Sequence, residues 1–194
     1  MKIHSIVLAG AALLAPPAVA ANLTVVKVAA PAVNCVFNAS CTVTVNDSVG
    51  KLTFSQLGDG AFFQSRTYPA VAGTPGAGNT AYEYRLDLRQ ANIFAECVAG
   101  LVLNIGPVTK LTYPQNQPGH VFVVTQGGLG SVGIKSADQN GSVITFTFDK
   151  PLCPGATSYF FGLAASAAPV HASAMMFGPG AVPFIPSDVR VPAH

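Results

Sequence analysis

The sequence predicts an all-β protein: a single antiparallel β-sandwich of jelly-roll or Ig-like type, with about ten strands and disulfide staples. Three observations support this fold class. Short runs of β-branched and aromatic residues alternate with Gly, Pro, Asn and Asp along most of the chain. The apolar period of 3.6 residues that marks a helix is nearly absent. Four cysteines, an even number, follow an N-terminal export signal.

Residues 1–20 predict a signal peptide. Lys2 supplies the basic start, residues 6–14 form an apolar stretch, and Ala18-Val19-Ala20 is a typical cleavage site. The apolar stretch of about ten residues is too short to span a bilayer, which takes about 20. We therefore expect a signal of bacterial type that is cleaved after Ala20, which leaves a mature single domain over residues 21–194. The mature protein is expected to be secreted, and to lie at the cell surface, in the periplasm or outside the cell.

The clearest strand covers residues 82–89, where apolar and charged residues alternate strictly. One face carries Tyr82, Tyr84, Leu86 and Leu88, and the other carries Glu83, Arg85, Asp87 and Arg89. This pattern predicts a half-buried strand whose charged face lies in solvent. Residues 142–148 alternate in the same way after a predicted turn over residues 138–141. The other predicted strands are residues 23–28, 41–45, 51–54, 61–67, 101–105, 120–125, 157–163 and 170–177.

The cysteines predict two disulfides, because disulfides form and persist in an oxidising compartment. Four cysteines allow three pairings. We favour Cys35 with Cys41, since the five residues between them include Asn38-Ala39-Ser40, which can reverse the chain. Cys97 and Cys153 then pair by elimination. The absence of a C-x-x-C motif and of a neighbouring histidine argues against a metal site, so no metal ligands are predicted.

Composition and motifs argue against several functions. A net charge of +2 with only 9% charged residues gives no basic face for nucleic acid. Residues 128–133 match G-x-G-x-x-G, but a turn follows instead of a helix, so we interpret them as a bend between strands and predict no cofactor. The sequence contains no G-x-S-x-G motif, and His120, His171 and His194 are scattered. We therefore predict that the protein is not an enzyme.

One loop, residues 113–120, combines a ring, amides and prolines. Its candidate ligand-binding residues are Tyr113, Gln115, Asn116, Gln117 and His120. Amide side chains beside an aromatic ring supply the paired donors, acceptors and apolar face that a sugar needs. The alternative is a plain hairpin connection, in which prolines set the turn and the amides face water.

These patterns predict an exported, non-enzymatic structural or adhesive component of a cell surface, matrix or filament. The low charge and the apolar strand 23–28 favour this function, since that strand offers an edge to a second copy or a surface partner. The alternative is a secreted carbohydrate-binding module that holds glycan in the 113–120 loop, although the chain has no Trp. A hydrolase is a distant third. Chaperone-assembled pilus subunits share the export signal and the apolar first strand but space their cysteines differently, so none of their properties is carried over.

Overall fold

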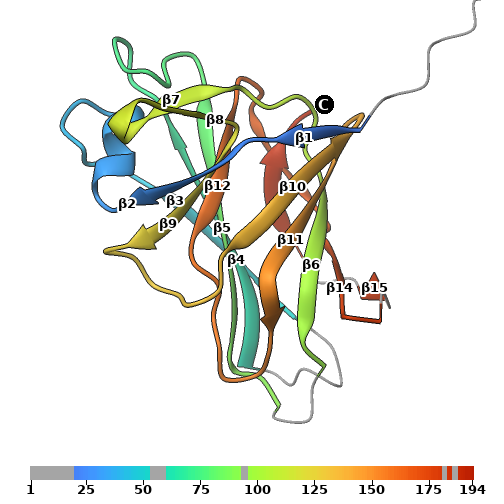
Figure 1. Ribbon diagram of the computed structural model, residues 1–194. Coiled ribbons are helices and arrows are strands. Elements are labelled where there is room, and N and C mark those ends of the chain that lie inside the picture. Colours follow the sequence, from blue (N-terminus) through green and yellow to red (C-terminus); the bar gives the residue numbers. More distant parts are fainter. Residues whose placement is uncertain (1–19, 53–59, 93–95, 181–182, 185–187) are drawn as a thin grey trace, which may run out of the picture.

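Two six-stranded β-sheets make up most of the fold in the computed structural model (Figure 1). The structure describes residues 20–52, 60–92, 96–180, 183–184 and 188–194. The predicted signal peptide, residues 1–20, lies outside these ranges except for Ala20. The packed sheets confirm the all-β sandwich that the alternation of residues predicted.

The first sheet contains six strands in the spatial order β1-β10-β11-β6-β14-β15. Its strands are β1 (Ala21–Leu23), β10 (Ile134–Asn140), β11 (Val143–Leu152), β6 (Val98–Asn104), β14 (Met175–Phe177) and β15 (Pro183–Phe184). All its neighbouring strands are antiparallel. The turn between β10 and β11 is shorter than predicted, because β10 continues to Asn140 and pairs it with Val143. Gly141, with φ of 60°, occupies this tight turn.

The second sheet has the order β2-β9-β12-β5-β4-β3. Its strands are β2 (Val25–Ala29), β9 (Val121–Gln126), β12 (Phe161–Ala165), β5 (Thr80–Gln90), β4 (Gly60–Pro69) and β3 (Asn46–Lys51). Its pairs are antiparallel except for β2 with β9, which run parallel. Residues 41–45 precede β3 and do not form the strand that the sequence predicted.

Shorter elements complete the described fold. These are the pair β13 (Pro169–Ala172) and β16 (Val189–Pro192), the hairpin of β7 (Leu111–Tyr113) and β8 (Gln117–Gly119), and the 3-10 helices η1 (Ala32–Val36) and η2 (Pro114–Asn116). The strands outnumber the predicted ten because several are pieces of two to four residues. Each such piece is too brief to leave a clear alternation in the sequence.

The first strands close the sandwich on one side. β1 pairs with β10 in the first sheet, and β2, only one residue later, pairs with β9 in the second (Figure 1). Thr24 stands between them, and its carbonyl oxygen accepts hydrogen bonds from the N–H groups of His120 (2.9 Å) and Val121 (3.1 Å). The N-terminal segment is therefore an edge strand of both sheets.

The core between the sheets confirms the predicted buried face of strand 82–89. Tyr82, Tyr84, Leu86 and Leu88 are fully buried there. The Tyr84 ring packs between Phe63 and Phe161, each with a centroid distance of 5.8 Å. Phe161 in turn contacts Phe146 of the first sheet at 5.3 Å. These aromatic contacts join the two layers.

A second apolar cluster covers part of the outer face of the second sheet. It combines outward-facing residues of β2, β4, β5, β9 and β12 with residues of η1 and the β7–β8 hairpin. Its larger members include Phe37, Tyr68, Tyr113, Phe122 and Phe160. Because this cluster lies outside the sandwich, the second sheet is buried on both faces over part of its area.

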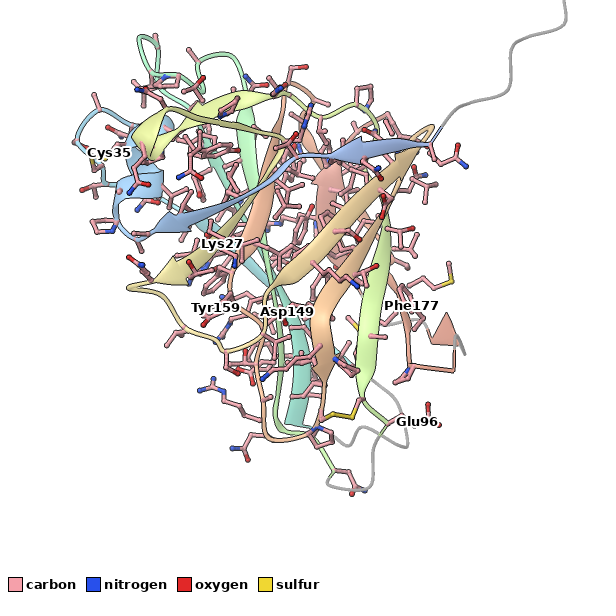
Figure 2. All side chains as sticks on the ribbon, in the orientation of Figure 1. Lys27, Cys35, Glu96, Asp149, Tyr159 and Phe177 are labelled. Carbon is pink, nitrogen blue, oxygen red and sulfur yellow. A yellow bond between two sulfur atoms is a disulfide. The ribbon has the colours of Figure 1, made fainter. Side chains whose placement is uncertain are left out.

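The two predicted disulfides are both present. Cys35 is bonded to Cys41 and Cys97 to Cys153, and no cysteine is free. Figure 2 shows Cys35, a residue of η1, at one end of the molecule. The second disulfide lies near Glu96 at the opposite end, where it joins the start of β6 to the chain just after β11. The pairing of near neighbours, favoured from the spacing, is thus confirmed.

Candidate functional site

The predicted ligand loop forms a hairpin between β7 and β8. Gln115, with φ of 65°, and Asn116, with φ of 56°, stand at its tip in the left-handed backbone region. Two adjacent positive φ values are typical of tight hairpin turns. Both side chains are exposed. The Gln117 amide donates hydrogen bonds to the Pro114 carbonyl oxygen (3.4 Å) and to Gln115 Oε1 (3.3 Å). The turn therefore presents three amide groups close together.

Two pockets adjoin at this hairpin, because Ala32, Pro114 and Gln115 line both. The first hairpin pocket has a volume of about 350 Å³, and its other lining residues are Cys35, Val36, Pro75, Thr112, Tyr113 and Asn116. The second hairpin pocket has about 230 Å³, and its other lining residues are Lys27, Val28, Ala29, Gln117, Thr125 and Gln126. The first is mainly apolar, whereas the second is bordered by an ammonium, a hydroxyl and three amides.

Tyr113 does not offer an exposed ring to a ligand. Its side chain is buried in the outer cluster, where it packs on Phe122 with a centroid distance of 5.6 Å. Its hydroxyl has no hydrogen-bond partner among the described residues, and burial raises the pKa of Tyr113 well above its usual value. Tyr113 thus forms a wall of the first hairpin pocket and supports the turn.

His120 lines neither hairpin pocket. Its Nδ1 accepts a hydrogen bond of 3.1 Å from the backbone N–H of Thr24, where the chain passes from β1 to β2. Only a neutral imidazole can accept at that nitrogen. Burial, together with the positive charge of Lys110, lowers the pKa of His120 and so favours the neutral form. The structure therefore gives His120 a role in holding the N-terminal strand.

The prediction of a solvated outer face on strand 82–89 is wrong for three of its four charged residues. Glu83, Arg85 and Asp87 are 7%, 6% and 1% exposed, and only Arg89 reaches solvent. β5 is an inner strand flanked by β4 and β12, and residues of the outer cluster cover its far side. The sequence did carry a signal for a partly apolar outer face. Residues 62–68 alternate so that Phe62 and Tyr68 share a face with Arg66.

The buried charges form a network across β3, β4 and β5. Arg85 Nε donates to Gln64 Oε1 at 3.1 Å, and its guanidinium lies 3.5 Å from the Asp87 carboxylate. Arg89 donates three hydrogen bonds to the same carboxylate, the shortest 2.5 Å. Burial acts to raise the pKa of Asp87, but these hydrogen bonds and charges outweigh it and hold the pKa below its usual value. Asp87 is thereby kept ionised.

Further along the same face, a third pocket opens beside Glu83. This Glu83 pocket has a volume of about 270 Å³. Its lining residues are Ala30, Val33, Asn34, Val43, Val45, Arg66, Tyr68, Glu83, Val124, Gly127, Gly128, Leu129 and Phe160. Residues from β4, β5, η1, the chain before β3 and the loop after β9 line this pocket. Because these segments are far apart in the sequence, no local sequence pattern predicts the pocket.

Glu83 stands at the edge of the apolar cluster. Its register partners are Arg66 on β4 and Gly162 on β12. Gly162 is a position of close approach, because a Cβ there would come within 2.6 Å of the Phe122 ring. Burial raises the pKa of Glu83 from 4.5 to about 7; the Arg66 charge acts against this rise and that of Asp47 adds to it. Near neutral pH both forms of the carboxyl are therefore populated.

The G-x-G-x-x-G segment, residues 128–133, connects β9 to β10 as a bend, as predicted, and no helix follows it. Gly127 and Gly128 instead line the Glu83 pocket. A Cβ on Gly127, where φ is 70°, would come within 2.6 Å of the Ala30 carbonyl oxygen. The small residues thus let this loop approach the segment before η1.

No known protein family, curated protein or solved structure matches the chain. Neither 3-10 helix of the described ranges has the length and apolar character needed to cross a membrane. In the part of the chain that the structure describes, no three His, Cys, Asp or Glu side chains gather in a way that could hold a metal ion.

Proposed function

We propose that the protein is an exported, non-enzymatic adhesive module of a cell surface or extracellular matrix, which binds glycan chains at the β7–β8 hairpin. The compartment is supported by the two disulfides, which an oxidising environment maintains. The adhesive role is supported by the hairpin pockets. The proposal joins the predicted surface component with its predicted alternative, the carbohydrate-binding module.

One observation carries the proposal: the amides of the hairpin, two exposed and one half-buried, border two adjoining pockets of different character. Gln115 lines both, Asn116 lines the first and Gln117 the second. An amide offers a donor and an acceptor side by side, which matches the paired hydroxyl groups of a sugar. The ammonium of Lys27 and the hydroxyl of Thr125 add polar contacts in the second hairpin pocket.

The first hairpin pocket suits the less polar face of a sugar ring. Val36, Pro75 and Pro114 supply apolar surface there, and Tyr113 closes the wall from inside. Among the described residues that line the two hairpin pockets, none carries a carboxyl or an imidazole group. The proposal therefore assigns binding and no reaction to this surface.

The test is binding of the mature protein to a panel of immobilised polysaccharides. We expect one or more of them to retain the wild type, and a double variant, Gln115→Ala with Gln117→Ala, to lose about tenfold or more in affinity, equal to about 1.4 kcal/mol. Asn22→Ala is the matched control, because it removes an exposed amide of β1 that lines neither hairpin pocket. Equal binding by the double variant, with its fold verified by circular dichroism, would remove the hairpin from the proposal.

Self-association through the N-terminal strand is a second candidate. The strand is less free than predicted, since β1 and β2 each already pair within the chain. Each is nevertheless the outermost strand of its sheet among the described residues, so one edge remains for a neighbour. Size-exclusion chromatography with light scattering decides between the two: a mass above one chain that rises with concentration supports assembly, and a constant single-chain mass removes it.

A further inference from the structure

The Glu83 pocket contains a carboxylate that has no ion-pair partner among the described residues. Glu83 is buried, and no Lys, Arg or His nitrogen of the described residues lies within the 4.0 Å of an ion pair with its oxygens. A buried carboxylate is costly unless it is paired or hydrogen-bonded. A structural carboxylate would be expected to have such a partner in the chain. An unpaired one that lines a pocket is instead a feature of a binding site.

Among the charged groups near the pocket, Asp47 and Arg66 act on Glu83 most directly, whereas Arg85, Asp87 and Arg89 form a separate group of net charge +1 further along β5. Arg66 faces Glu83 from β4, but its Nε is bonded to Asp47 of β3 at 2.8 Å. Its guanidinium also lies over the Phe160 ring, 4.6 Å from the centroid. Arg85, two residues along β5, is bonded to Gln64 and lies beside Asp87. With Glu83 ionised, the set of Asp47, Arg66 and Glu83 therefore carries a net charge of −1.

A second group in the pocket also has no partner. The Tyr68 hydroxyl is buried and makes no hydrogen bond to the described residues. It is close enough to Glu83 that the carboxylate, after burial itself, contributes to raising the pKa of Tyr68. Buried hydroxyl groups normally have a hydrogen-bond partner, so this oxygen keeps an unused hydrogen-bonding capacity beside the pocket.

The remaining wall is apolar. Val33, Val43, Val45, Val124 and Leu129 line the pocket together with the Phe160 ring. The volume of about 270 Å³ is below the 300 to 1,000 Å³ typical of sites for drug-sized ligands. A fitting ligand is therefore small, with a hydrocarbon part for the valines and one cationic, hydrogen-bond-donating end for Glu83.

We propose that the Glu83 pocket binds a small primary alkylammonium compound, with its ammonium group against the Glu83 carboxylate and the Tyr68 hydroxyl. An ammonium group has three donors and no acceptor, which suits the two carboxylate oxygens of Glu83 and the Tyr68 hydroxyl oxygen, none of which has a hydrogen-bond partner among the described residues. Its charge neutralises the set formed by Asp47, Arg66 and Glu83. An anion is disfavoured, because the nearby guanidinium of Arg66 is already paired. This site is separate from the hairpin pockets, so neither proposal depends on the other.

The proposal has a pH signature. The titratable and charged groups that face Glu83 are Arg66 and Tyr68 on β4 and Asp47 on β3, with Arg85 next along β5. An ammonium ion prefers the ionised carboxylate, so binding near pH 7 releases a proton and weakens as the pH falls. With a pKa of about 7 for Glu83, the ionised fraction drops about thirtyfold between pH 8 and pH 5.5. An alkylammonium ion stays charged throughout that range.

The test is calorimetric titration of the mature protein with n-butylammonium chloride, using n-butanol as the uncharged probe of similar shape. We expect binding at pH 8, an affinity about thirtyfold lower at pH 5.5, and much weaker binding of n-butanol. Glu83→Gln should lose most of the affinity and all of its pH dependence, and Tyr68→Phe should lose a smaller part. Glu96→Gln is the matched control, since Glu96 is exposed at the opposite end of the molecule (Figure 2) and should bind like the wild type.

Three results would overturn the proposal. They are no binding of n-butylammonium at pH 8, equal affinity for n-butanol, and unchanged binding by a folded Glu83→Gln variant. If that variant does not fold, the wild type alone decides. Titrations at pH 7 in two buffers of different ionisation enthalpy should then show proton release on binding, and the absence of release would refute the role of Glu83.

Discussion

Replacing Glu83 with glutamine keeps the shape of the side chain and removes its charge, so it isolates the free energy of burying that charge. Burial raises the pKa of Glu83 from 4.5 to about 7. At about 1.4 kcal/mol per pH unit, this difference corresponds to about 3 kcal/mol. The carboxyl is almost completely buried, so solvent screens little of this energy.

The sign of the effect follows from proton binding. The folded state holds the proton of Glu83 up to about pH 7, whereas an unfolded chain releases it near pH 4.5. The stability contributed by Glu83 is therefore fully present below about pH 4.5 and is lost as the pH rises through 7. Between pH 4.5 and pH 8, the wild type should lose about 3 kcal/mol relative to Glu83→Gln, because the glutamine does not titrate.

The assay is urea unfolding of both proteins, with disulfides intact, at several pH values from 4.5 to 8. Buffers without amine groups are needed, since an amine would occupy the proposed site and stabilise the wild type selectively. The other titrating groups are common to both proteins and cancel in the difference. Parallel stability profiles across the range would refute the reasoning, because they would mean that Glu83 is ionised in the folded protein without cost.

Three further predictions concern β5, the N-terminal strand and the longer disulfide. Leu86→Ala should lower the free energy of unfolding by about 2 to 5 kcal/mol, and Arg85→Ala by about 2 kcal/mol or more, because both faces of β5 are buried; urea unfolding measures both. His120→Ala should lower the free energy of unfolding by about 1 kcal/mol near pH 7.5, because it removes the hydrogen bond from Thr24. The pKa of His120 is lowered in the folded protein, so the wild type should lose stability as the pH falls below 6.5, and the alanine variant should lose less. Replacing both Cys97 and Cys153 with serine should cost about 4 kcal/mol in thermal or urea unfolding.

Each of these predictions has an opposing outcome. An effect within about 0.5 kcal/mol for Arg85→Ala would place that side chain in solvent, as the sequence alone suggested. An unchanged pH profile in His120→Ala would mean that the imidazole does not accept the backbone hydrogen bond. A double serine variant as stable as the wild type would show that the long disulfide joins segments already held by their strands.

The inner face of β5 could be predicted because the alternation of its own residues is enough to indicate a buried face. Four apolar side chains at every second position indicate a strand with one buried face, and that inference needs no knowledge of the rest of the chain. The short disulfide was equally local, since only five residues separate Cys35 from Cys41, and the pairing of Cys97 with Cys153 then followed by elimination. The fold class followed from many such signals repeated along the chain.

The outer face of β5 was mispredicted for the opposite reason. Charged residues normally lie in solvent, and here their burial depends on residues distant in sequence, such as Phe160, whose ring centroid lies 5.1 Å from the Arg85 guanidinium. β10 was missed because Lys135, Ser136 and Asp138 hide its alternation, and its pairing with β11 decides its structure. The Glu83 pocket is likewise assembled from segments between residues 30 and 160, so the sequence shows its residues only as isolated polar and apolar positions.

The position of the first strands also dictates the order of folding. Ala21 pairs with Gln139, and Val25 pairs with Val121, so the first described strands have no partners until more than half of the chain has been synthesised. Contacts between such distant segments form slowly, because a long loop must close before they gain any energy. The N-terminal strands thus cannot pair with either sheet while only the N-terminal part of the chain has been synthesised. The two sheets can therefore be joined by the N-terminal segment only after the partner strands β9 and β10 are present.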